Sequence, residues 1–164
     1  MRKIFFSALA VFLLAALAAA LPGADIENTA NGVSIWLPDD WETDNDEVQG
    51  AVYADAPEED AFCVLQVLVN GDDLTAALSL YGDALSEEMD TFAATGKTQT
   101  PLNGMGAWRI QGEGRRDEKT WSVYVLLVST GKAVLMCALG WEKDKEGQFA
   151  FLRDKIFTSI KKLE

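Results

Sequence analysis

Apolar and polar residues alternate in short runs along much of the chain, and turn-forming residues separate these runs. Runs of this length that end at Gly, Pro, Asn or Asp are typical of β-strands. They predict strands over 33–37, 51–54, 62–69, 121–128 and 133–141. In 62–69 and 121–128 both alternating faces are apolar, so we expect each of these two strands to be covered on both sides.

Two other stretches repeat apolar residues every three or four positions, which is typical of amphipathic helices. The first begins after Asp72 or Asp73, either of which can accept hydrogen bonds from the first turn, and its apolar stripe continues to Phe92. The second begins near Asp144, and its stripe continues to Leu163. We expect both helices to bury these stripes against a sheet.

A hairpin signal lies between the two predicted helices. Asn103-Gly104 favours a two-residue loop that joins strands over 97–102 and 105–111, and 112–117 predicts a looser loop. The order of the elements predicts an α+β fold, with an antiparallel sheet of about seven strands and helices packed on its faces as an α/β/α sandwich. No repeat, low-complexity tract or linker interrupts 21–164, so we expect a single domain.

The first 20 residues have the pattern of a secretory signal peptide. Arg2 and Lys3 precede an uncharged apolar run that starts at Ile4 and ends in small residues at Ala20. We therefore expect cleavage after Ala20, a mature chain of residues 21–164, and a periplasmic or secreted protein. An uncleaved membrane anchor is the alternative, because the apolar run is close to the length that spans a bilayer.

Charge is divided unevenly along the chain. Residues 21–96 contain 18 acidic residues and no Lys or Arg, whereas residues 97–164 contain 12 basic and 8 acidic residues. Either the two halves neutralise each other within the domain, or an acidic face binds a cationic partner. Asp83, Glu87 and Asp90 lie on the polar side of the first predicted helix and are the candidate interaction face. The negative charge argues against a nucleic-acid partner.

The chain has no histidine, which excludes Ser-His and Cys-His nucleophile pairs and most zinc sites. No catalytic motif is present, so we predict a binding protein with no cofactor and no metal. Two alternatives remain open. The acids of 39–47 form either a solvated turn or part of a calcium-stabilised module, and a carboxylate-dependent hydrolase would need two carboxylates in a buried pair.

Two kinds of residue leave open questions about packing. Cys63 and Cys137 fall in two predicted central strands, and they form either a disulfide or two buried free thiols. Trp36 points away from the apolar face of its strand, and Trp41 lies next to the acidic segment. Each of these two tryptophans is a candidate either for packing under a helix or for the interaction face.

The sequence resembles the PsbP-like fold over residues 31–162. The resemblance rests on Gly32-Val33-Ser34-Ile35, on Pro38 and Trp41, on the order of strands, helix and hairpins, and on the final Phe157-Thr158-Ser159-Ile160. Within this group the exported bacterial DcrB-like proteins are the most similar, because they share the leader. The resemblance implies a non-catalytic binding or assembly module. With the leader and the acidic charge, we expect a module of the cell envelope whose partner is an envelope protein or a cationic ligand. Because histidine is missing, no metal ligand is carried over.

Overall fold

The computed structural model describes residues 22–46 and 48–164. The predicted signal peptide, and its alternative as a membrane anchor, lie outside the described residues. Among the residues that are described, no helix is long and apolar enough to span a membrane. The elements are, in chain order, β1 (Gly23–Asn28), β2 (Val33–Pro38), β3 (Glu42–Asp46), β4 (Ala51–Asp55), β5 (Ala61–Asn70), α2 (Leu74–Leu85), β6 (Thr91–Gln99), β7 (Ala107–Arg116), β8 (Lys119–Ser129), β9 (Ala133–Glu142), η1 (Lys143–Lys145), α3 (Glu146–Ser159) and β10 (Lys161–Lys162).

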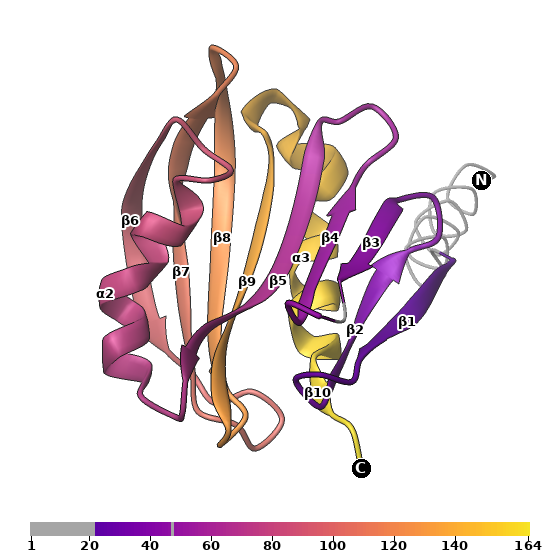
Figure 1. The fold of residues 1–164 in the computed structure, drawn as a ribbon. Helices are drawn as coiled ribbons and strands as arrows, with labels where there is room; N and C mark the ends of the chain where they lie inside the picture. The colour runs from indigo at the N-terminus through magenta and orange to yellow at the C-terminus, as the bar shows by residue number, and fades with distance from the viewer. Residues whose placement is uncertain (1–21, 47) are drawn as a thin grey trace, which may run out of the picture.

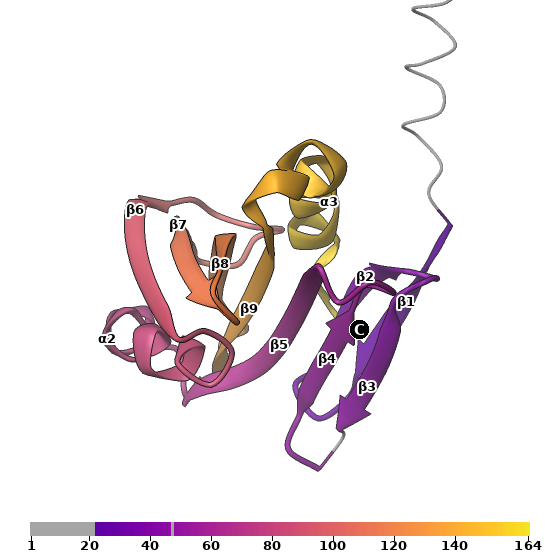
Figure 2. The ribbon, with the colours of Figure 1, turned by 90° about the horizontal axis from the view of Figure 1, so that it is seen from above.

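The strands form two antiparallel sheets (Figure 1). The large sheet has seven strands in the order β3-β4-β5-β9-β8-β7-β6, and the small one has three in the order β1-β2-β10. Figure 2 shows α2 and α3 on opposite sides of the large sheet, with the small sheet next to β3 and β4. The predicted α+β fold, with about seven strands in one antiparallel sheet and helices on its faces, is confirmed.

Alternate residues of the central strands enter two separate cores. On one side of the sheet, Val64 of β5 and Val125 of β8 pack with α2. On the other side, Leu65 of β5 and Leu126 of β8 pack with α3 and with the inner face of β2. Each of these four side chains is at most 3% exposed. The prediction that 62–69 and 121–128 are covered on both sides is therefore confirmed.

The first helix is shorter than its apolar stripe predicted. Helix α2 ends at Leu85, and after a turn the N–H of Asp90 donates to the carbonyl oxygen of Arg115 on β7, so that strand β6 begins. Phe92 lies on β6, yet its ring packs on that of Tyr81 in α2, with 6.2 Å between the centroids. The apolar stripe thus continues within one core while the backbone changes from helix to strand.

The predicted loop over 112–117 is wrong. Strand β7 continues to Arg116, and the turn consists of Asp117 and Glu118, whose φ angles are 51° and 65°. Gly112 lies inside strand β7. A Cβ at this position would be 2.3 Å from the carbonyl oxygen of Ala93 on β6, so a residue with a side chain does not fit there. This glycine allows two strands to approach closely and does not mark a loop.

The hairpin predicted at Asn103-Gly104 is confirmed. These two residues have φ angles of 48° and 78°, and they lie between the paired strands β6 and β7. At the C-terminus the second helix ends at Ser159, before the end of its predicted stripe. Lys161 and Lys162 then form the short β10, which pairs with β2.

Two further strands have no clear signal in the sequence. Strand β1 pairs along the whole length of β2. Residues 42–46, expected in a solvated acidic turn, form the edge strand β3, which pairs with β4. Asp, Asn and Glu are poor strand formers, so pairing with β4 outweighs the local preference of these residues.

Candidate functional site

The three acids of the candidate interaction face are all exposed. Asp83 and Glu87 lie at the C-terminal end of α2 and just beyond it, and Asp90 lies immediately before β6. None of the ion pairs within 22–46 and 48–164 includes any of the three. Their negative charges are therefore balanced by no direct cationic contact in the described part of the chain.

Further acids adjoin these three across the face of the large sheet. Tyr53 on β4 is within reach of the charges of Glu87 and Glu88, which follow α2, and of Asp44 and Asp46 on β3. Burial raises the pKa of Tyr53, and these negative charges raise it further. We name the combined set the acidic surface. It comprises Asp44, Asp46, Asp83, Glu87, Glu88 and Asp90.

Arg116 lies at one border of this surface, where its charge reaches Glu88. Its guanidinium lies 5.7 Å from the ring centroid of Phe62 and 5.5 Å from that of Trp121. Burial raises the pKa values of Asp55 and Glu88, and the charge of Arg116 lowers both in part. Arg116 is thus held between aromatic rings and carboxylates at the border of the acidic surface.

The carboxylates at this border do not form the buried pair that glycoside hydrolysis needs. Asp55 is exposed and Glu88 is only half-buried. An open cavity of about 440 Å³ lies beside them and is lined by Asp40, Glu42, Asp55, Ala56, Pro57, Glu59 and Arg116. Within the described residues, no group of three or more Cys, Asp or Glu side chains is placed to hold a metal ion.

The structure does not bring Trp36 and Trp41 onto the acidic surface. Trp41 is 6% exposed and packs edge-on against Phe149 of α3, with 6.4 Å between the ring centroids. Trp36 is half-buried, with the Nζ atom of Lys155 on α3 3.5 Å from its ring centroid. Its ring also covers Gly23 of β1 so closely that a Cβ there would be 2.1 Å away. Both tryptophans lie on the α3 side of the large sheet, whereas α2 and its acids lie on the other side.

Cys63 and Cys137 are buried free thiols in this structure, with 3.8 Å between their sulfur atoms. They lie on the adjacent strands β5 and β9 but are not directly opposite, because Cys63 faces Leu139 and Cys137 faces Leu65. The hydrogen bond between the two thiols, followed by burial, raises the pKa of Cys137 well above its usual value. This thiol therefore holds its proton at neutral pH, which makes it a poor nucleophile.

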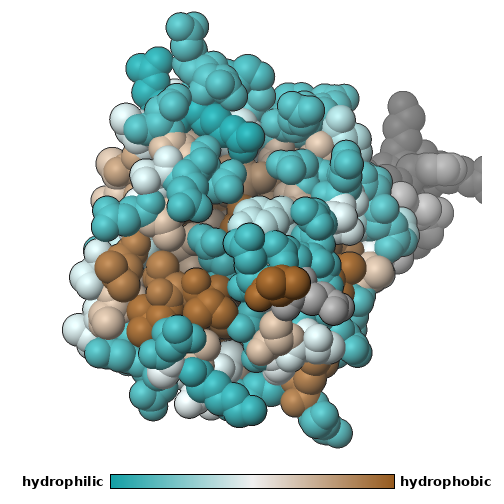
Figure 3. All heavy atoms as spheres, in the orientation of Figure 1, coloured by the Kyte–Doolittle hydropathy of each residue, from teal (hydrophilic) through white to brown (hydrophobic). Residues whose placement is uncertain are grey.

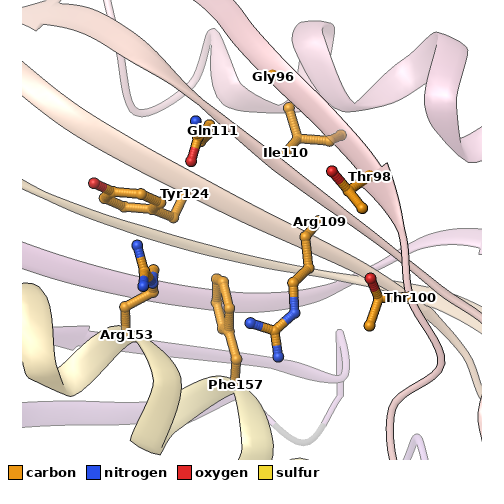
Figure 4. Close-up of a pocket in the computed structure, with 9 residues that line it drawn as sticks. All are labelled: Gly96, Thr98, Thr100, Arg109, Ile110, Gln111, Tyr124, Arg153 and Phe157. Atoms are coloured by element: carbon orange, nitrogen blue, oxygen red, sulfur yellow. The ribbon is translucent and has the colours of Figure 1, made fainter.

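A second candidate site lies on the α3 side of the sheet. A cavity of about 310 Å³ opens between α3 and the strands β6, β7 and β8. We name it the arginine groove, and Figure 4 shows its lining, which consists of Gly96, Thr98, Thr100, Arg109, Ile110, Gln111, Tyr124, Arg153 and Phe157. Arg109 reaches it from β7 and Arg153 from α3, and each side chain is about one-third exposed.

The two arginines share one carboxylate. Arg109 Nη1 donates to Asp154 Oδ1 at 3.2 Å, and Arg153 donates from Nε and Nη2 to the two oxygens of the same carboxylate at 3.1 Å each. Hydrogen bonding and charge from Arg153, with the charge of Arg109, outweigh burial and lower the pKa of Asp154. Two guanidinium groups therefore share the Asp154 carboxylate at this groove, and the charge of Arg153 also reaches Glu146, which accepts a hydrogen bond from Tyr124.

Sequence reasoning missed the arginine groove. Arg109 and Arg153 are far apart in the chain, and each looks like an ordinary polar residue of a strand or a helix. Only the packing of α3 against the sheet brings them together. The division of charge along the chain placed basic residues in the second half but gave no sign that two of them converge.

Comparison with known proteins supports the fold. No protein-family model matches the chain, and no curated protein matches its sequence. The solved structure of the cyanobacterial PsbP protein CyanoP from Synechocystis superposes with a TM-score of 0.64, covering 88% of this chain and 94% of that one at 12% identity. This chain has a PsbP-like fold.

Two other solved structures are similar to this PsbP-like chain. A Pseudomonas aeruginosa protein of unknown function, described as a putative regulator, has a TM-score of 0.52 and 12% identity, covering 84% of this chain and 95% of that one. LpqN of Mycobacterium tuberculosis, described as involved in cell envelope biogenesis, is 18% identical and covers 87% and 86%, with a TM-score of 0.49. At 12% identity, the similarity to CyanoP and to the Pseudomonas protein shows the fold alone.

Proposed function

We propose that this PsbP-like protein is an exported, non-catalytic binding module of the cell envelope that binds a cationic partner through its acidic surface. The leader over residues 1–20 supports export. The observation that carries the binding proposal is the set of exposed acids at Asp83, Glu87 and Asp90, which take part in no ion pair among residues 22–46 and 48–164.

Neutralisation between the two halves of the chain occurs elsewhere. Lys145 lies 3.6 Å from Glu58 and 3.4 Å from Asp60, and Lys161 lies 3.3 Å from Asp25. These ion pairs join the acidic first half to the basic second half, but they include no residue of the acidic surface. Carboxylates that repel one another destabilise the free protein, and a cationic partner would relieve that repulsion.

Apolar side chains next to these acids favour a protein partner over a simple cation. Figure 3 shows hydrophobic residues gathered over α2 and the neighbouring end of β5, among hydrophilic ones. Leu80 of α2 is 42% exposed, and Val48, two residues after Asp46, is 97% exposed. Exposed apolar residues beside charged ones are typical of surfaces that bind other proteins.

The test compares two triple variants with the mature protein. Asp83→Lys, Glu87→Lys and Asp90→Lys together reverse the candidate face, and Glu27→Lys, Asp144→Lys and Glu164→Lys make the same change in net charge at exposed positions elsewhere. Each immobilised protein is incubated with envelope extract, and the retained proteins are identified and then titrated in purified form. Circular dichroism checks that both variants fold.

We expect the first variant to lose the retained partner and the matched control to keep it, with binding that weakens as salt increases. Equal retention by both variants would reject the acidic surface as the site. A wild-type protein that retains nothing beyond an inert control protein would contradict the binding function itself.

A further inference from the structure

We propose that the arginine groove binds the anionic group of a small hydroxylated ligand, a carboxylate or a phosphate, and that Asp154 occupies the two guanidinium groups until this ligand arrives. The proposal concerns a different surface from the acidic one and a ligand of opposite charge. A test of this proposal is therefore independent of any test of the proposed function.

The first argument is the convergence of two guanidinium groups from separate elements. Arg109 on β7 and Arg153 on α3 both donate to Asp154, at 3.2 Å and 3.1 Å. Planar guanidinium groups donate two parallel hydrogen bonds to carboxylates and phosphates, which is the geometry that Arg153 and Asp154 already form. An anionic group of a ligand can occupy the same positions.

The second argument is charge balance. Two arginines contact Asp154, and the charge of Arg153 also reaches Glu146, in a chain whose formal net charge is −12. Hydrogen bonds from Tyr124 and Trp141 hold Glu146 in place, so the two guanidinium groups have a positive charge in excess when Asp154 turns away. The side chain of Asp154 is 58% exposed, so it can turn out to solvent when a ligand takes over its hydrogen bonds to the two arginines. A local positive site in an acidic protein attracts a small anion while the surrounding charge repels large polyanions such as nucleic acid.

The third argument is the rest of the lining. The guanidinium of Arg153 lies 5.0 Å from the ring centroid of Tyr124, and that of Arg109 lies 6.0 Å from that of Phe157, so both are positioned by aromatic rings. Thr98, Thr100 and Gln111 add hydroxyl and amide groups on the strand side (Figure 4). These groups can bind the hydroxyls of a ligand, and a volume of about 310 Å³ suits a small molecule.

The experiment titrates three sugars into the mature protein by calorimetry and by NMR of the arginine Nε–H signals. Glucose 6-phosphate carries a phosphate, galacturonate carries a carboxylate, and glucose carries neither. We expect saturable binding of at least one anion, at concentrations up to about 10 mM, and weaker binding at high salt. Preference between the two anions identifies the source of the anionic group. Absence of binding by both anions, or equal binding of glucose, would overturn the proposal.

Variants separate the site from general folding effects. Arg109→Gln and Arg153→Gln should each weaken anion binding by about ten-fold or more, whereas Arg115→Gln, which removes the same charge from the β7–β8 hairpin, should leave it unchanged. Asp154→Asn removes the competing carboxylate and should strengthen binding by about three-fold or more. A gain of affinity cannot come from misfolding, so unchanged or weaker binding by Asp154→Asn would also overturn the proposal.

Discussion

The hydroxyl of Tyr124 on β8 donates a hydrogen bond to Oε1 of Glu146, the first residue of α3, with 3.0 Å between the two oxygens. The indole N–H of Trp141 on β9 donates to the other oxygen of the same carboxylate. The start of α3 is thereby attached to two central strands. Although burial raises the pKa of Glu146, hydrogen bonds from Trp141, Ser122 and Tyr124 outweigh it and hold that pKa below the usual 4.5.

This carboxylate predicts a loss of stability in acid. A pKa that is lower in the folded state than in the unfolded state means that ionised Glu146 stabilises the fold above about pH 4.5, and that this stabilisation is lost as the pH falls through the folded-state pKa. We expect Glu146→Gln to lower the free energy of unfolding by about 1 to 2 kcal/mol at pH 7. Urea unfolding at pH 7 and at about pH 3 should show the difference shrinking in acid.

Glu27→Gln is the control for this prediction, because Glu27 is an exposed acid on β1. It should change the unfolding free energy little at either pH. A difference between the wild type and Glu146→Gln that stayed constant with pH would show that the ionised carboxylate is not responsible.

Because Cys63 and Cys137 are buried, we expect the number of reactive thiols to depend on whether the protein is folded. Both sulfur atoms are buried, and the raised pKa of Cys137 keeps it protonated, so the native protein should react with a thiol reagent very slowly. After denaturation without reductant we expect two reactive thiols. A count of zero in the denatured protein would instead show that the 3.8 Å gap closes into a disulfide in solution.

Adding one methyl group at Gly112 should lower the stability of the fold substantially. A Cβ at this position would be 2.3 Å from the carbonyl oxygen of Ala93 and 2.7 Å from the ring of Phe92, and the backbone atom cannot move aside without disturbing the pairing of β6 and β7. We expect Gly112→Ala to lower the free energy of unfolding by about 2 to 4 kcal/mol. Thermal and urea unfolding measure this loss.

Gly82 in α2 is the matched control. A Cβ there meets nothing within 4 Å, so Gly82→Ala should raise the stability by about 0.5 to 1 kcal/mol, because alanine favours a helix more than glycine does. If the two variants behaved alike, close approach of the strands could not explain the glycine in β7.

Removing the side chain of Asp73, which caps the start of α2, should lower the stability by a smaller amount. Its Oδ1 accepts hydrogen bonds from the N–H groups of Thr75 and Ala76, at 2.9 Å each, whereas Asp72 contributes its backbone carbonyl. We expect Asp73→Ala to lower the free energy of unfolding by about 1 kcal/mol and Asp72→Ala to lower it much less. Urea unfolding decides between them, and an equal loss in both variants would contradict the assignment of the cap to Asp73.

The sequence predicted the elements whose residue pattern is compatible with only one kind of structure. Val64 and Leu65 are adjacent in β5 and enter different cores, so a strand that is apolar on both faces requires cover on both sides. Asn103-Gly104 predicted its turn because both residues tolerate a positive φ.

The errors arose where one residue type serves two purposes. Phe92 continued the apolar stripe of α2 because it fills the same core, although it does so from a strand. Gly112 resembled a loop residue because glycine also allows strands to approach closely. The arginine groove could not be predicted, because Arg109 and Arg153 meet only when α3 packs on the sheet.

The acidic composition of strand β3 also affects how copies of the protein associate with one another. This strand forms one open edge of the large sheet, where unpaired backbone groups could add a strand from another copy. Glu42, Asp44 and Asp46 place three carboxylates within its five residues. Two such edges repel each other, so a segment that lowers the local preference for a strand also protects the protein against aggregation.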